Sequence, residues 1–174
     1  MNIPKNIIQF WHDKKNVPAI VKNAMKVTKK VNPEFNIVFV DDRLMFEWIY
    51  THYGSKYLLL YQLNDIAASR ADIARLMMLY EYGGFYLDAE MELSRSFSTL
   101  VDTDILLVQR DDARKYKNCP EKAHVINGII GLSQKSELAS WCLSRIEKNL
   151  ITGCYNQSVW HATGPGRAIA LKIA

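Results

Sequence analysis

Two acidic side chains one residue apart, Asp88 and Glu90, are the pair whose spacing most directly suggests chemistry. If residues 86–92 form a strand, side chains alternate between two faces, so both carboxylates lie on one face, about 6–7 Å apart. Neighbouring carboxylates near a sheet interior are costly unless a cation or hydrogen-bond donors neutralise them. Because Mg²⁺ and Mn²⁺ prefer oxygen ligands and share them with phosphate, the pair predicts a divalent-metal site. The alternative is an edge strand whose acidic face is only solvated.

The helix predicted just before this segment carries a second charged pair. From about residue 65 to residue 82, apolar side chains spread around most of the helix, which predicts that it is largely buried. It nevertheless contains Asp72 and Arg75, three residues apart and therefore neighbours on the helix surface. Buried charges need partners. Either the two form a structural ion pair, or Asp72 binds a ligand hydroxyl and Arg75 binds a phosphate or sugar oxygen.

A pair of glycines and a tryptophan each have two interpretations. Gly83 and Gly84 follow the predicted helix, where they either end it as a C-cap or also let the backbone approach a ligand. Trp11 follows an apolar strand, and it is either a core residue or a platform on which a flat base stacks. The residues alone leave these alternatives open.

Three residues nearer the C-terminus are further candidates. Asn127 and Gly128 lie in a predicted strand, where they either bring an amide to an acceptor sugar or mark a polar kink. His161 precedes the turn at Thr163 and could supply a third metal ligand or a phosphate contact. No Ser/His/Asp or Cys/His arrangement for a nucleophile stands out, and neither a P-loop nor a GxGxxG motif is present.

The elements that must position these residues follow from apolar patterns and breakers. The first third alternates strand, helix, strand and helix, over residues 6–11, 18–32, 36–40 and 43–52. That order predicts parallel strands joined by crossovers, an α/β sheet. The remaining predicted elements are the helix 65–82, strands 85–93, 104–109 and 125–132, the helix 137–150 and a helix that begins near residue 167.

Composition places the chain among ordinary globular proteins. It has 174 residues, 49% apolar and 23% charged, which is enough to build a core. That length supports one domain, residues 1–174. Four Trp, nine Tyr and six Phe supply the apolar area that excludes a disordered chain.

The sequence predicts a cytoplasmic protein. The N-terminus lacks a basic region followed by an apolar stretch, and no run approaches the roughly 20 apolar residues of a membrane-spanning helix. Three cysteines without CxxC spacing are typical of reduced thiols. The net charge of +4 is too small and dispersed for a nucleic-acid surface. Lys22, Lys26, Lys29 and Lys30 form either a solvated helix face or a peripheral contact with anionic lipid at the inner membrane face.

Three stretches resemble a known family. Residues 67–75 and 79–90, which contain the pattern Gly-Gly-Phe-Tyr-Leu-Asp-Ala-Glu, look like the signature block of DXD-containing sugar transferases. Residues 3–11 are similar to that family's opening "IPKxIHQxW" strand, and residues 163–165 are similar to its TGP turn. The family comprises Och1-like mannosyltransferases, capsular-polysaccharide and lipopolysaccharide glycosyltransferases and, more distantly, clostridial toxin glucosyltransferases.

The resemblance implies a GT-A-like fold, a Rossmann-like mixed sheet flanked by helices, and a UDP- or GDP-linked sugar donor. It implies that Mn²⁺ (or Mg²⁺) is bound directly by Glu90, while Asp88 contacts donor ribose or sugar and the metal's water shell. By the same resemblance, the remaining donor-binding residues are Trp11 near the base, Asp72 at sugar or ribose hydroxyls, Arg75 at donor oxygens, Tyr86 at the diphosphate, and Gly84.

Two features depart from the family pattern. The second acid is normally Asp, whereas here it is Glu90, whose extra methylene moves the carboxylate by roughly one bond length. Relatives also continue well beyond the TGP turn, whereas this sequence ends at Ala174. We therefore expect the fold to be incomplete at its C-terminal end.

The resulting prediction is a metal-dependent glycosyltransferase that moves a sugar to a glycan acceptor in surface polysaccharide synthesis, such as capsule or lipopolysaccharide. The resemblance implies retention of anomeric configuration, so no general base is assigned. A non-catalytic nucleotide-sugar- or glycan-binding module is the main alternative. A metal-dependent phosphohydrolase is disfavoured, because Asp88 and Glu90 are the only compact acid pair for which the pattern predicts a metal site.

Overall fold

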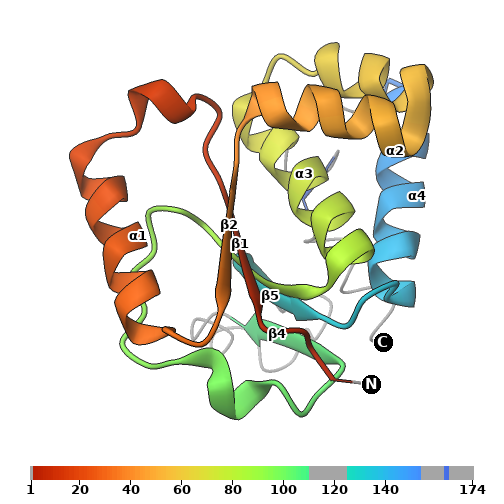
Figure 1. Ribbon diagram of the computed structural model, residues 1–174. Helices are drawn as coiled ribbons and strands as arrows, with labels where there is room; N and C mark the ends of the chain where they lie inside the picture. Colours follow the sequence, from red (N-terminus) through yellow and green to blue (C-terminus); the bar gives the residue numbers. More distant parts are fainter. Residues whose placement is uncertain (1, 110–124, 154–162, 165–174) are drawn as a thin grey trace, which may run out of the picture.

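A five-stranded mixed sheet forms the centre of the computed structural model, which describes residues 2–109, 125–153 and 163–164 (Figure 1). The strands occur in the order β2-β1-β3-β5-β4. Strands β2, β1 and β3 are parallel, and β5 is antiparallel to both β3 and β4. Their bounds are β1 Asn6–Phe10, β2 Asn36–Val40, β3 Gly84–Leu87, β4 Ile105–Gln109 and β5 Val125–Leu132.

Helices cover both faces of this sheet. Helix α1, Ala19–Val31, lies on one face, while α2 (Asp42–Gln62), α3 (Ala67–Tyr82) and α4 (Glu137–Ile151) lie together on the other (Figure 1). Two short 3₁₀ helices, Lys14–Asn16 and Phe97–Leu100, join the larger elements. The predicted crossovers between parallel strands are therefore confirmed.

The strand order creates a switch point at the centre of the sheet. From β1 the chain passes through α1 to β2 on one side, and from β2 it passes through α2 and α3 to β3 on the other side of β1. In open α/β sheets, ligands bind at the carboxyl ends of the strands where the order reverses in this way. The carboxyl ends of β1 and β3 are therefore the expected place for a site.

Apolar clusters hold the layers together, and the two largest lie on opposite faces of the sheet. The larger lies between the sheet and α2, α3 and α4, and the run 73–79 of α3 is entirely buried there, as predicted. On the opposite face, Phe85 stacks on Phe97 with ring centroids 4.5 Å apart, and Phe35 packs edge-on against both. Because β3 is covered on both faces, Phe85 and Tyr86 are each fully buried.

The predicted strand 85–93 is wrong beyond Leu87. After Leu87 the chain turns, and the Met91 backbone N–H donates to the Asp88 carbonyl at 2.9 Å. Side chains in a turn no longer alternate between two faces. The strand argument for placing Asp88 and Glu90 on one face therefore fails.

Helix α2 is twice as long as predicted. The segment 43–52 is its first half, and a second helical segment continues to Gln62 after a break at Gly54, where φ is +80°. A positive φ suits glycine, which has no Cβ to clash with the backbone. The chain therefore bends here without leaving the helical layer.

Several predictions lie outside the described residues, namely those for His161, the thiols of Cys119 and Cys154, and the helix near residue 167. Among the described helices, none is long and apolar enough to cross a membrane. The single domain 1–174 stays a prediction.

Candidate functional site

A cavity of about 450 Å³ opens at the carboxyl ends of β1 and β3. Its walls come from the residues after β1, the first half of α3, the turn after β3, and β5. Seven residues singled out in the sequence line this one cavity: Trp11, Asp72, Arg75, Tyr86, Asp88, Glu90 and Asn127. Its volume lies in the range of sites that enclose a small organic ligand.

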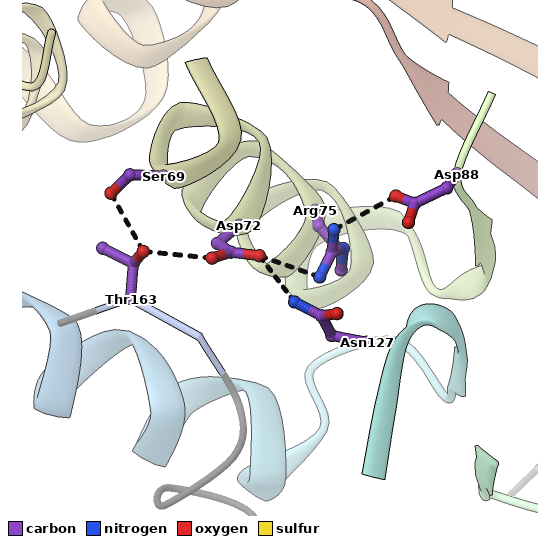
Figure 2. A network of polar contacts seen from close by, with 6 residues as sticks. All are labelled: Ser69, Asp72, Arg75, Asp88, Asn127 and Thr163. Carbon is purple, nitrogen blue, oxygen red and sulfur yellow. Dashed lines mark hydrogen bonds and ion pairs between the residues drawn. The ribbon is translucent and has the colours of Figure 1, made fainter. Parts of the chain in front are cut away.

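Asp72 is the most heavily hydrogen-bonded side chain of the site (Figure 2). Its Oδ1 accepts from Arg75 Nη1 at 3.0 Å and from Asn127 Nδ2 at 2.9 Å. Its Oδ2 accepts from the Thr163 hydroxyl at 3.0 Å, and Ser69 donates in turn to Thr163 at 2.9 Å. Three donors on a carboxylate that is 5% exposed fix its orientation.

Arg75 connects the two carboxylates of the cavity. Besides its bond to Asp72, its Nη2 lies 3.3 Å from Asp88 Oδ1, and its guanidinium carbon lies 4.2 Å from the centre of the Tyr86 ring. The side chain is 4% exposed, and its Nε has no hydrogen-bond partner in the part of the chain that the structure describes. The predicted ion pair is therefore present.

Burial dominates the electrostatics of the inner wall. It raises the pKa of Asp72 above its ordinary value, and the Arg75 charge and the Thr163 hydrogen bond offset this only in part. It also raises the pKa of Tyr86, so that the phenol stays neutral at ordinary pH. The guanidinium of Arg75 remains charged throughout. The wall thus presents one cation facing two acids.

The acid pair after β3 lies at the more open side of the cavity. The Asp88 side chain is 35% exposed, and Glu90 is exposed. The Asp88 backbone N–H donates to the Gly128 carbonyl at 2.8 Å, which holds the start of the turn on β5. Both acids reach the cavity because of this turn, and not because of strand alternation.

The chemistry of this pair fits a hard divalent cation. Both side chains offer only carboxylate oxygens, the ligands that Mg²⁺ and Mn²⁺ prefer. Among the described residues, no group of three or more His, Cys, Asp or Glu side chains could hold a metal. Two protein ligands are the usual number where substrate phosphates complete the coordination. The pair therefore suits a metal that arrives with a phosphorylated ligand.

Trp11 is both a core residue and part of the cavity wall. It packs with Val17, Val21 and Ala89, and its ring lies 5.4 Å from that of His12. Its indole Nε1 is buried and has no hydrogen-bond partner among residues 2–109, 125–153 and 163–164. An unpartnered indole N–H that borders a cavity can donate to a ligand acceptor.

Gly84 does not line the cavity. It lies at the opposite end of β3, where an added Cβ would meet the Asn6 carbonyl oxygen at 2.6 Å. The close backbone approach that its sequence suggested is therefore an approach to β1, and the structure gives no support for a donor contact. The neighbouring Gly83, with φ +63°, ends α3 as its C-cap, as the sequence predicted.

Two partners of Asp72 were not found from the sequence. The sequence suggests an acceptor contact or a polar kink for Asn127 and a turn for Thr163, yet both donate to Asp72. They lie 55 and 91 residues away from it along the chain. Short-range sequence patterns do not predict contacts between residues so far apart along the chain. The one signal in the sequence was that Asn127 is a polar residue within a predicted strand.

Comparison with known proteins identifies relatives. Residues 18–110 match the family model described as "Glycosyltransferase sugar-binding region containing DXD motif". Inositol phosphoceramide mannosyltransferase 3 of Schizosaccharomyces pombe is 33% identical over 57% of this chain and 27% of its own. An uncharacterised glycosyltransferase of Acanthamoeba polyphaga mimivirus is 28% identical over 74% and 49%. The chain therefore spans only about a quarter to a half of these curated relatives.

Solved structures share the fold. The structure titled "PaToxG Glycosyltransferase" matches with a TM-score of 0.74 and 20% identity, over 99% of this chain and 70% of that one. The ligand-free glycosyltransferase domain from the YGT toxin matches with a TM-score of 0.51 and 10% identity, over 91% and 64%. These likenesses confirm the predicted GT-A-like fold, a mixed sheet flanked by helices.

Proposed function

This chain belongs to the glycosyltransferase family whose sugar-binding region contains a DXD motif, and from that membership we propose that it transfers a sugar from a nucleotide-sugar donor to an acceptor hydroxyl. The observation that carries the proposal is the convergence of Asp72, Arg75, Asp88 and Glu90 on one cavity. Buried, fixed polar groups beside exposed carboxylates supply both hydroxyl recognition and charge stabilisation.

Asp72 and Arg75 are proposed to hold the sugar. A carboxylate has about four acceptor positions, and Asp72 already accepts three hydrogen bonds, which leaves one for a sugar or ribose hydroxyl. Arg75 lines the same cavity, and its guanidinium is the matching donor for a sugar or phosphate oxygen. Trp11 would contact the base of a UDP- or GDP-linked donor, and Tyr86 would lie beside the diphosphate.

Asp88 and Glu90 are proposed to hold Mn²⁺ or Mg²⁺. When bound, such an ion neutralises the charge that develops on the departing nucleoside diphosphate. Glu90 is free to turn toward it, since it is exposed and makes no ion pair within the described part of the chain. We propose retention of anomeric configuration from the family resemblance alone, and we assign no general base.

The acceptor is proposed to be a glycan or a hydroxylated membrane lipid. Two S. pombe relatives are named inositol phosphoceramide mannosyltransferases, which favours mannose as the sugar and a lipid head group as the acceptor. Capsular polysaccharide and lipopolysaccharide remain alternative products. In either case the acceptor belongs to a membrane or cell surface, and the exposed lysines of α1 would suit peripheral contact with anionic lipid at the inner membrane face.

Calorimetric titration with UDP-, GDP- and CMP-sugars, with and without Mn²⁺, tests this function. We expect one donor to bind in a Mn²⁺-dependent manner and to release its nucleoside diphosphate when an acceptor is present. Asp88→Asn and Glu90→Gln should each weaken Mn²⁺ affinity about tenfold or more, because each removes a charged ligand.

Glu92→Gln is the matched control. This acid is exposed, contacts Asn23 at 3.4 Å and does not line the cavity, so its loss should change nothing. Binding of a donor without any turnover would instead favour the non-catalytic module. Absence of binding for every donor, or equal effects at Glu90 and Glu92, would contradict the proposal.

A further inference from the structure

Strand β5 contains an irregularity beside the cavity. Its ladder with β4 pairs Leu107 with Ile130 and then Val108 with Ile126. Residues 127–129 of β5 therefore have no pairing partner in β4. On its other side β5 still pairs Ile129 with Leu87 of β3. The extra residues form a bulge, a feature that bends a strand and redirects its side chains.

The bulge reverses which face of the sheet the side chains occupy. Beyond it, Ile130 and Leu132 face the core under α3, while Ile129 faces the opposite core. Regular alternation would place Asn127 with Ile129, away from α3. Instead Asn127 donates to Asp72, which belongs to α3 (Figure 2). The odd number of unpaired residues explains this reversal.

The same bulge brings Gly128 against the other carboxylate. A Cβ at Gly128 would lie 2.7 Å from Asp88 Oδ2 and 3.0 Å from the sulfur and terminal methyl of Met91. Gly128 has no positive φ, so its backbone conformation is open to other residues. A side chain at this position would therefore displace the ends of the Asp88 and Met91 side chains, because the Asp88 carboxylate occupies the volume that its Cβ would fill.

We propose that this bulge positions both carboxylates of the site, with Asn127 orienting Asp72 and Gly128 leaving the space in which Asp88 faces the cavity. Asn127 and Gly128 are thus positioning residues, and they lie outside residues 18–110, which match the family model. This inference rests on the proposed function for its consequence, since misplaced carboxylates would bind metal and donor poorly. The positions of the carboxylates themselves can be tested without either ligand.

Gly128→Ala is the decisive variant, and we measure its effect in two ways. The first is the NMR signal of the Arg75 guanidinium in the ligand-free protein, which should shift because its partner Asp88 moves. The second is Mn²⁺ binding, measured with the ion alone and with UDP or GDP, which should weaken about tenfold or more as for other residues that orient metal ligands. Asn127→Ala should shift the Arg75 signal as well, through Asp72.

Gly131→Ala is the matched control, because it lies in the same strand and its added Cβ would meet the Phe85 ring at 2.8 Å and no carboxylate. It should destabilise the protein while leaving the Arg75 signal and Mn²⁺ affinity unchanged. Adding Met91→Ala to Gly128→Ala removes the competing contact with Met91 but not the one with Asp88, so it should not restore metal affinity.

The two proposals fail in different ways. An Arg75 signal that is unchanged in Gly128→Ala, or that moves equally in Gly131→Ala, would overturn the positioning role. Recovery of Mn²⁺ affinity in the Gly128→Ala/Met91→Ala variant would overturn it as well. If the Arg75 signal shifts as expected but the parent protein binds no Mn²⁺ with any nucleotide, the positioning role stands and the proposed function fails.

Discussion

Replacement of Arg75 by methionine tests the electrostatic account of the site most directly. Arg75 is the cation that faces both Asp72, at 3.0 Å, and Asp88, at 3.3 Å. Methionine retains much of the length and apolar surface of arginine but carries no charge. The variant therefore leaves the buried Asp72 carboxylate without its cation, while Asn127 and Thr163 remain as neutral donors.

The expected loss of stability is large because water screens this pair poorly. The two side chains are 4% and 7% exposed. Coulomb's law with an effective dielectric constant of about 20 gives about 5 kcal/mol for unit charges at this separation. Removal of one partner of a buried ion pair generally costs about 3–5 kcal/mol. We therefore expect the free energy of unfolding at neutral pH to fall by about 3–5 kcal/mol.

The loss should depend on pH in a defined direction. Burial raises the pKa of Asp72 above its value in the unfolded chain, so between the two values the folded state binds more protons. Stability therefore falls as the pH rises through this window. Without Arg75 the pKa of Asp72 rises further and the window widens. The difference between variant and parent should be largest near neutral pH and should shrink toward the ordinary pKa of a carboxyl group.

Urea unfolding at about pH 4.5 and about pH 7.5 measures this difference. The double variant Asp72→Asn/Arg75→Met has no unpaired buried charge, because Asp88 is partly exposed, and it should regain much of the loss. Arg70→Met is the matched control, because Arg70 pairs with Asp42 in the same layer but the two side chains are 17% and 15% exposed. It should cost about 1–3 kcal/mol. An Arg75→Met loss no larger than that of Arg70→Met, and equal at both pH values, would refute the reasoning.

Two further predictions concern stability away from the cavity. Asn32 is fully buried, donates to the Thr28 carbonyl and accepts from the Phe97 backbone N–H. Asn32→Ala should therefore lower the free energy of unfolding by about 1–3 kcal/mol. Calorimetry should find nucleotide binding unchanged, and a parallel loss of binding would contradict this prediction. Gly54 and Gly83 both have positive φ, but an added Cβ meets nothing within 4 Å at Gly54 and meets Pro4 at 2.8 Å at Gly83. Thermal unfolding should therefore show a loss of about 1–3 kcal/mol for Gly54→Ala, whose φ of +80° and ψ of −178° suit glycine, and a larger loss for Gly83→Ala. Equal losses would rule out the steric argument.

Much of the fold was predictable because the signals are local. The bounds of β2, β4 and α4 agree with the predicted ones to within a residue, since apolar patterns and breakers act over a few neighbours. The C-cap at Gly83 was predictable for the same reason. Local patterns failed where a strand and a turn can have the same sequence pattern. The apolar and polar residues of segment 86–92 alternate as in a strand, yet the chain turns after Leu87.

The sequence predicted most of the candidate residues that line the cavity, but it did not predict their geometry. Trp11, Asp72, Arg75, Tyr86, Asp88 and Glu90 all line one cavity, whereas Gly84 lies at the opposite end of its strand. The hydroxyl that donates to Oδ2 of Asp72 belongs to Thr163, which is far away along the chain. Such partners are chosen by packing between distant segments, and a single sequence does not record that packing.

The amino-acid sequence by itself determined the chemical groups, the succession of strands and helices, and the resemblance to sugar transferases. Each of these depends only on side-chain types and on their spacing over a few residues. The tertiary structure alone decided how those groups face one another. The turn after β3 brings Glu90 to the cavity, and the bulge in β5 directs Asn127 to Asp72 and makes room for Asp88. Bulges and turns depend on how neighbouring strands pair, and that pairing is set by the whole fold.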